Sequence, residues 1–162
     1  MKKFLLVLTS LFLLICLTSC EHVPAPKITK AEFPFEIVYQ IGDETITVND
    51  TFVCEFDGFG WNENFGRNRR WKGYVKSTGG DRLVLLEKDG RKVVCSLGSP
   101  AYYMSDPLGP VAEELIPEVS YTETLPSGGV TSGALNAESL FEKYGITLLS
   151  WEFSAPIENS YE

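Results

Sequence analysis

The sequence predicts a mainly β fold, an antiparallel β-sandwich or open barrel with one short helix near the C-terminus. Short runs in which apolar and polar residues alternate recur along most of the chain, as in strands with one buried face. Glycine, asparagine and aspartate separate these runs at intervals typical of turns. Helical patterns do not alternate with the runs, so a parallel α/β fold is not expected.

The first two strands are predicted at residues 32–41 and 44–57, on either side of a Gly-Asp turn. Phenylalanine, isoleucine and tyrosine occupy every second position of the first strand, which marks its buried face. Pro34 has no backbone N–H to donate to a neighbour, so we expect this strand at the edge of a sheet. Asn49 and Asp50 interrupt the second run, where we expect a bulge or a break.

A β-hairpin is predicted at residues 82–97, because two strand-like runs flank Lys88-Asp89-Gly90. Asp-Gly pairs accept the positive φ angles that tight hairpin turns need. The remaining elements of this part of the chain are strands at residues 71–77, 101–104 and 119–124, a helical turn at residues 111–116 and a loop at residues 125–133.

The best-marked helix spans residues 137–144. Asn136 can cap its N-terminus, and Gly145 can end it in the left-handed conformation. Its apolar stripe is expected to face the core and consists of Leu140, Phe141 and Tyr144. A last strand follows at residues 146–153, with one face formed by Leu149, Trp151 and Phe153.

The chain begins with a leader: two lysines precede an apolar run at residues 4–17, and small residues follow. This order is typical of a secretory signal peptide. The run is shorter than the about 20 residues of a membrane-spanning helix. Leu17-Thr18-Ser19-Cys20 resembles the lipobox of bacterial lipoproteins, and all four positions match.

The resemblance implies cleavage after Ser19 and a diacylglyceryl thioether on Cys20, with acyl chains such as palmitate. The domain would then be extracytoplasmic and anchored to a membrane of the cell envelope, for which two acyl chains suffice. The alternative is an ordinary secreted protein that is cleaved near Ser19 and leaves Cys20 unmodified.

We expect four segments in this order: a signal peptide at residues 1–19, the lipidated cysteine and an extended tether at residues 20–31, one β domain at residues 32–156 and a polar tail at residues 157–162. Pro24 and Pro26 favour an extended tether of about 3.1 Å per residue, which would lift the domain roughly 30 Å from the membrane.

The mature chain is acidic. Loss of the leader removes Lys2 and Lys3 from the 14 basic residues, which leaves 12 against 22 acidic residues and a formal charge of −10. Such a charge repels phosphate backbones, so nucleic acid is not an expected partner.

Cys54 and Cys95 lie on inward faces of strand-like runs. A disulfide between them is permitted outside the cytoplasm and would add about 3–4 kcal/mol of stability. The alternative is that each is a small buried apolar residue. Neither a CxxC motif nor a neighbouring histidine is present, so we expect no metal site and no cofactor.

The most unusual stretch, residues 57–72, is expected to be a long loop rich in glycine, aromatic residues, asparagine and arginine. Aromatic rings can stack on sugar rings, and arginine can hold a carboxylate or phosphate with two hydrogen bonds. The candidate ligand-binding residues are Trp61, Asn62, Asn64, Arg67, Arg69, Arg70 and Trp71. The alternative is structural: both tryptophans close the core and the arginines pair with acids. The spacing of its oxygen donors does not match a calcium loop.

Catalytic residues are not identified. The chain has no GxSxG motif, and its single histidine, His22, precedes the domain. A pair of carboxylates acting as a glycosidase stays open as a third hypothesis. The sequence therefore favours a binding or interaction module over an enzyme, with a glycan or cell-wall ligand for residues 57–72 or a structural role beside envelope proteins as the alternatives.

Overall fold

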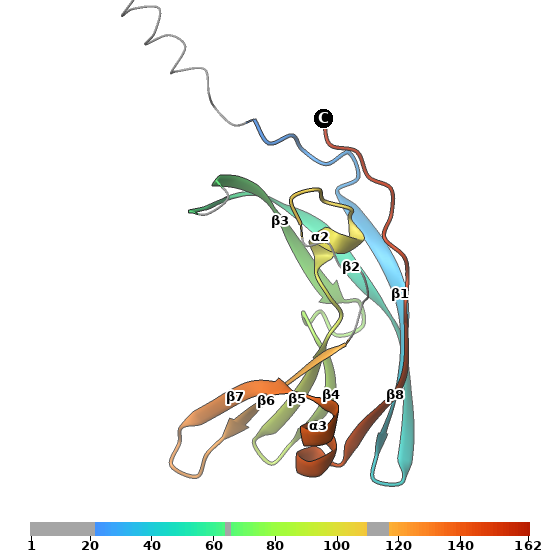
Figure 1. The fold of residues 1–162 in the computed structure, drawn as a ribbon, viewed down its shortest axis with the longest axis vertical. Coiled ribbons are helices and arrows are strands. Elements are labelled where there is room, and N and C mark those ends of the chain that lie inside the picture. The colour runs from blue at the N-terminus through green and yellow to red at the C-terminus, as the bar shows by residue number, and fades with distance from the viewer. Residues whose placement is uncertain (1–21, 64–65, 110–116) are drawn as a thin grey trace, which may run out of the picture.

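The computed structural model describes residues 22–63, 66–109 and 117–162. The leader with Cys20, Asn64 and the helical turn expected at residues 111–116 lie outside these ranges. The predicted fold class is confirmed, because the described residues form two antiparallel sheets of four strands each and two short helices (Figure 1).

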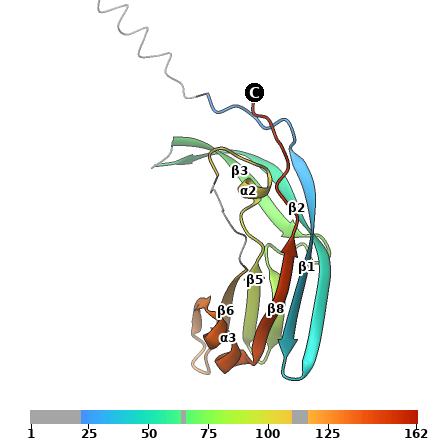
Figure 2. The ribbon, with the colours of Figure 1, turned by 45° about the vertical axis from the view of Figure 1, so that its right-hand side comes forward.

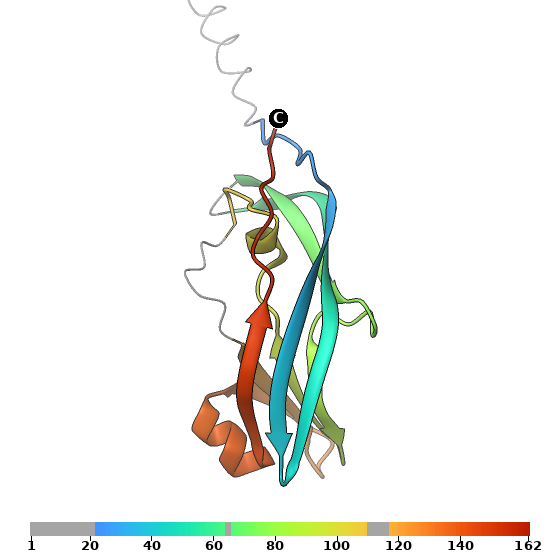
Figure 3. The ribbon, with the colours of Figure 1, turned by 90° about the vertical axis from the view of Figure 1, so that its right-hand side faces the viewer.

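The larger sheet has the strand order β3-β2-β1-β8 and curls along its length (Figure 3). Its strands are β1 (Lys30–Ile41), β2 (Glu44–Asn62), β3 (Gly66–Val75) and β8 (Ile146–Phe153). The smaller sheet has the order β4-β5-β6-β7 and faces the lower part of the larger one (Figure 2). Its strands are β4 (Leu83–Lys88), β5 (Arg91–Ser96), β6 (Glu118–Thr124) and β7 (Val130–Leu135). The helices are α2 (Pro100–Tyr103) and α3 (Ala137–Tyr144).

β1 lies in the centre of its sheet, so the edge position expected from Pro34 is wrong. β1 pairs with β2 along its whole length and with β8 from Phe35 onward. The carbonyl group of Pro34 accepts hydrogen bonds from the backbone N–H and hydroxyl of Ser154, and so points to the β8 side. The N–H and C=O groups of one strand residue point to the same side of the strand. An N–H at position 34 would therefore also point to the β8 side, beyond the last β1–β8 pair. Its absence in Pro34 removes no hydrogen bond to β2.

β2 and β3 form a long hairpin where the sequence predicts a long connecting loop, and the loop prediction is wrong. The expected irregularity at Asn49 and Asp50 is also wrong, because both residues stay in register with β1. The bulge lies further along, where Asp57 and Gly58 together face Arg70. Gly58 has a φ of 80°, a conformation that glycine adopts without strain and that bulges use. We call the outer part of this hairpin, residues 56–62 and 66–71, the arm.

The β4–β5 hairpin predicted around Asp89-Gly90 is confirmed. Both residues have positive φ angles, 50° and 74°, as the central pair of a two-residue turn requires. The loop expected at residues 125–133 is shorter, because Val130–Leu135 pairs with β6 as strand β7. Serine, threonine and glycine give this segment a loop-like composition, yet a neighbouring strand supplies its hydrogen-bond partners.

α3 has the predicted ends: the Asn136 side chain accepts from the backbone N–H of Ser139, and Gly145 closes the helix with a φ of 64°. Leu140 is buried as expected, but Phe141 is 62% exposed and does not belong to the core. The two residues are about 100° apart around a helix axis, and one side of α3 meets the sheets.

Residues 101–104, expected as a strand, instead form most of helix α2 and its C-terminal cap. Pro100 suits the first turn of a helix because it has no N–H to leave unpaired there. The last strand, β8, is confirmed, but a bulge turns Leu149 outward. Leu148 therefore faces inward together with Trp151 and Phe153.

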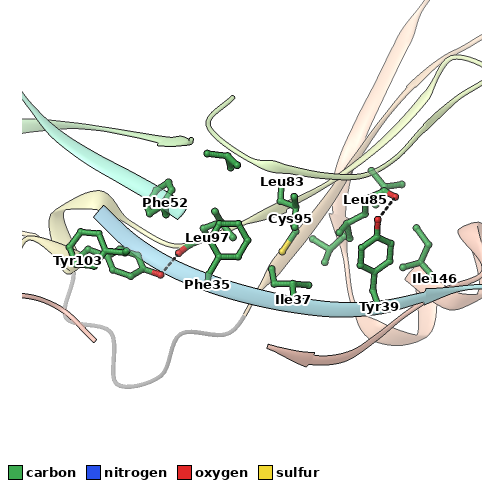
Figure 4. Close-up of a cluster of buried hydrophobic side chains, with 14 of the residues drawn as sticks. Phe35, Ile37, Tyr39, Phe52, Leu83, Leu85, Cys95, Leu97, Tyr103 and Ile146 are labelled. Atoms are coloured by element: carbon green, nitrogen blue, oxygen red, sulfur yellow. Dashed lines mark hydrogen bonds between the residues drawn. The ribbon is translucent and has the colours of Figure 1, made fainter. Parts of the chain in front are cut away.

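The core lies between the two sheets and extends under α2 (Figure 4). Two buried phenols each donate a hydrogen bond to a backbone carbonyl group. The Tyr39 hydroxyl donates to Leu85 at 3.3 Å, and the Tyr103 hydroxyl donates to Leu97 at 2.8 Å. These bonds offset the desolvation of the hydroxyl groups, and the Tyr39 bond joins the two sheets because it runs from β1 to β4.

Cys54 and Cys95 are both free thiols in this core, each 0% exposed. Of the two alternatives that the sequence left open, the structure has the unbridged one. Burial raises the pKa of each thiol to about 12, so both are neutral and act as small apolar residues.

Candidate functional site

The arm carries the described members of the predicted ligand-binding set. Trp61 lies near its tip, opposite Arg67, and its side chain is 76% exposed. The Arg67 guanidinium lies 4.4 Å from the centre of the Phe59 ring, a cation–π contact. Asn62 ends β2 beside this pair. The tip of the arm therefore presents one large ring and one cation to solvent.

Arg70 stabilises the bulge of the arm. Its guanidinium donates to the Asp57 carbonyl group at 3.0 Å and lies 3.6 Å from the Asp57 carboxylate. Both side chains are more than half exposed, so the ion pair itself contributes little free energy.

Arg69 and Trp71 belong to a buried group that we call the Asp106 cluster, together with Asp106 and Tyr161. The Nε and Nη2 atoms of Arg69 donate to the two carboxylate oxygens of Asp106 at 2.9 and 2.6 Å. These two side chains are 1% and 2% exposed. The Trp71 indole N–H donates to the same carboxylate at 2.8 Å, and the backbone N–H of Leu108 donates at 2.9 Å.

Four hydrogen bonds thus converge on one buried carboxylate. Burial alone would raise the pKa of Asp106, but the hydrogen bonds from Arg69, Trp71 and Leu108 favour the charged form and hold the pKa below its usual value. Asp106 is therefore ionised at neutral pH, and its charge is matched by a partner that is equally buried.

The Asp106 cluster also fixes both ends of the described chain. Arg69 donates from Nη1 to the Pro24 carbonyl group at 2.9 Å, and its guanidinium lies 4.2 Å from the centre of the Tyr161 ring. The Tyr161 hydroxyl donates to the Met104 carbonyl group at 2.6 Å. The cluster thus joins the N-terminal segment, the arm, the α2 region and the C-terminal segment.

The expected free tether and polar tail pair with each other instead. Pro26 forms a bridge with Tyr161, and the backbone N–H of Lys27 donates to the Ser160 carbonyl group at 2.9 Å. Both segments run together at the top of the molecule (Figure 1). A tether that lifts the domain about 30 Å from the membrane is therefore wrong.

The predicted site residues separate into two groups. Arg69, Arg70 and Trp71 are held by hydrogen bonds within the protein, as the structural alternative expects. Trp61 is 76% exposed, and the internal contact of Arg67 is the cation–π contact with Phe59. Trp71 faces Phe56, five residues before Trp61 on β2. At about 3.4 Å per residue the two tryptophans are roughly 15 Å apart along the arm, too far to stack on one sugar ring.

A cavity of about 680 Å³ lies where β6, β7 and α3 meet β8. Its apolar wall consists mainly of Leu135, Leu140, Leu148 and Trp151. Its polar residues include Arg82, Ser120 and Asn136, and Arg82 donates to the Ser120 hydroxyl at 3.0 Å. Sequence reasoning missed this site because its residues come from several separate elements, and only the apolar face of β8 gave a signal.

A second hollow, of about 470 Å³, lies at the opposite end, between the arm and the N-terminal segment. Its lining includes Val23, Arg67, Leu108 and Tyr161. Within the described ranges, no three His, Cys, Asp or Glu side chains are grouped so that they could hold a metal ion. No helix in the same part of the chain is long and apolar enough to cross a membrane.

Comparisons with protein-family models, with curated proteins and with solved structures found no match to this chain.

Proposed function

We propose that this protein is a lipid-anchored, extracytoplasmic binding protein of the cell envelope whose ligand site is the cavity beside β8 and α3. The lipobox-like sequence ending at Cys20 supports the anchor. The observation that supports ligand binding is the cavity itself. Its volume of about 680 Å³ falls within the range of small-molecule sites, about 300–1,000 Å³.

The lining indicates the class of ligand. Three leucines and the Trp151 ring offer an apolar surface, and Trp151 keeps 39% of its surface exposed. Arg82 provides a cation at the cavity, and the side chains of Glu118 and Asn136 also line it. An amphipathic molecule with an apolar body and an anionic group matches this arrangement.

Binding is favoured over catalysis by the placement of the chain's proton-transfer groups. The cavity is lined by Ser96, Ser120 and Glu118, and the two serine hydroxyls accept hydrogen bonds from the backbone N–H of Gly98 and from Arg82. The single histidine, His22, lines the hollow at the other end of the molecule. A serine nucleophile needs a base within hydrogen-bond reach. A glycan-binding role for the arm has less support, because Arg69, Arg70 and Trp71 are held by hydrogen bonds within the protein.

A fluorescent amphiphile, anilinonaphthalene sulfonate, tests this site. The protein should enhance the emission of the probe in a saturable manner, and Trp151→Ala should weaken the binding at least several-fold. The matched control is Leu149→Ala, two residues away on the opposite face of β8 and 49% exposed. Arg82→Gln should also weaken binding of the sulfonate, whereas Arg91→Gln in the β4–β5 hairpin should not. Equal effects of Trp151→Ala and Leu149→Ala, with both variants folded, would contradict the cavity as the site.

A further inference from the structure

The first described residues, which follow Cys20 closely in the sequence, are held at the end of the molecule that carries the arm. Pro24 is fixed by the hydrogen bond from Arg69, and Val23 lines the hollow beside the arm. Four residue steps separate Cys20 from Pro24, which span at most about 14 Å when fully extended. If Cys20 carries the anchor under "Proposed function", on which this inference rests, the bilayer surface lies within that reach of the arm.

The N-terminal segment and the loop after α2 meet the same side of the arm, because Arg69 donates to both Pro24 and Asp106. Trp61 and Arg67 are a cross-strand pair and so project to the same side of the arm. Arg67 lines the same hollow as Leu108 and Val23. We call Trp61, Arg67 and Leu108 the arm face. Figure 1 shows the arm and the N-terminal segment at the same end of the molecule, away from α3 and the β4–β5 hairpin.

The arm face has the chemistry of a membrane contact. Trp61 and Leu108 are 76% and 60% exposed, and Arg67, the cross-strand partner of Trp61, lines the same hollow as Leu108. Tryptophan prefers the boundary between lipid headgroups and acyl chains. Arg67 has no carboxylate within ion-pair distance among the residues that the structure describes, and a guanidinium binds phosphate with two hydrogen bonds.

We infer that the arm face lies on the surface of the bilayer that anchors Cys20, with Trp61 at the headgroup level and Arg67 against lipid phosphates. The Asp106 cluster keeps the arm in this orientation, because it fixes the arm and the N-terminal segment to each other. The protein is then seated on the membrane at one end, and the cavity beside β8 and α3 faces away from the lipid.

The test uses the full lipidated chain in vesicles of phosphatidylethanolamine and phosphatidylglycerol, with brominated phospholipids that quench nearby tryptophans. Trp61→Phe should lose most of the quenching seen in the natural protein. Trp151→Phe, which removes a ring beside the cavity, should keep it. Arg67→Glu should reduce the quenching, whereas Arg91→Glu at the other end should not.

The two proposals can fail separately. Flotation of the natural protein with vesicles, and loss of flotation in Cys20→Ala, tests the anchor. If the natural protein floats but brominated lipids do not quench Trp61, the seating on the membrane is overturned and the anchor stands. If Trp61 responds to oligosaccharides in solution and not to brominated lipids, the arm face binds glycans and the inference is also overturned.

Discussion

Replacement of Asp106 by alanine should destabilise the fold by about 3–5 kcal/mol, the usual loss when one partner of a buried ion pair is removed. The substitution leaves the Arg69 guanidinium 1% exposed and without its carboxylate, and it removes the acceptor of the Trp71 indole N–H. A domain of this size is stable by about 5–15 kcal/mol, so the loss is a large fraction of the total.

The assay is urea unfolding at neutral pH, followed by far-UV circular dichroism in a Cys20→Ser background. The matched control is Asp57→Ala, which removes the exposed ion pair with Arg70 and should cost less than about 1 kcal/mol. A double replacement, Arg69→Met with Asp106→Leu, removes both buried charges and should recover part of the loss. Similar small losses in Asp106→Ala and Asp57→Ala would refute the buried cluster.

Three further predictions follow from the same structure. The pKa of Asp106 is lowered on folding, so the stability that its ionised form contributes is present above the usual carboxyl pKa of about 4 and is lost as pH falls below it. In urea unfolding, the difference in free energy of unfolding between the natural protein and Asp106→Asn should therefore shrink below that pH. With pKa values of about 12, Cys54 and Cys95 should not react with a thiol reagent such as Ellman's until urea unfolds the chain, when both should react; an unfolded chain without reactive thiols would reveal a disulfide. Asn136→Ala should cost about 1 kcal/mol through loss of the helix cap, whereas the exposed Glu142→Ala should be nearly neutral in the same assay.

The elements that the sequence predicted well have local causes. The Asp89-Gly90 turn and the Asn136 and Gly145 caps depend on a few adjacent residues, and the structure has them where the sequence placed them. The alternation of apolar residues from Phe33 onward also indicates directly which face of the strand is buried. Such signals need no knowledge of which segments become neighbours.

The arm could not be predicted because its partner is remote. Its composition is that of a loop, and Arg69 looks like a free cation in the sequence. Asp106, which binds Arg69, is 37 residues away along the chain. The edge position expected from Pro34 was wrong for the same reason, because β8, which ends beside Pro34, comes more than a hundred residues later in the sequence.

The candidate site was predicted in part. The unusual residues of the arm were identified, but their division into buried and exposed members depends on the fold. Trp61 stays available, while Trp71 is committed to Asp106. The cavity needs β6, β7, α3 and β8 together, and no short motif marks it.

The central claim is that a lipid on Cys20 places this domain at the membrane, and the mass of the mature chain tests it most directly. The protein should be purified with detergent from the membrane fraction of a bacterium that expresses the full sequence. The account predicts a mature chain that begins at Cys20 and is heavier than the bare polypeptide by a diacylglyceryl group. A mature chain of unmodified polypeptide mass, recovered without detergent, would contradict it.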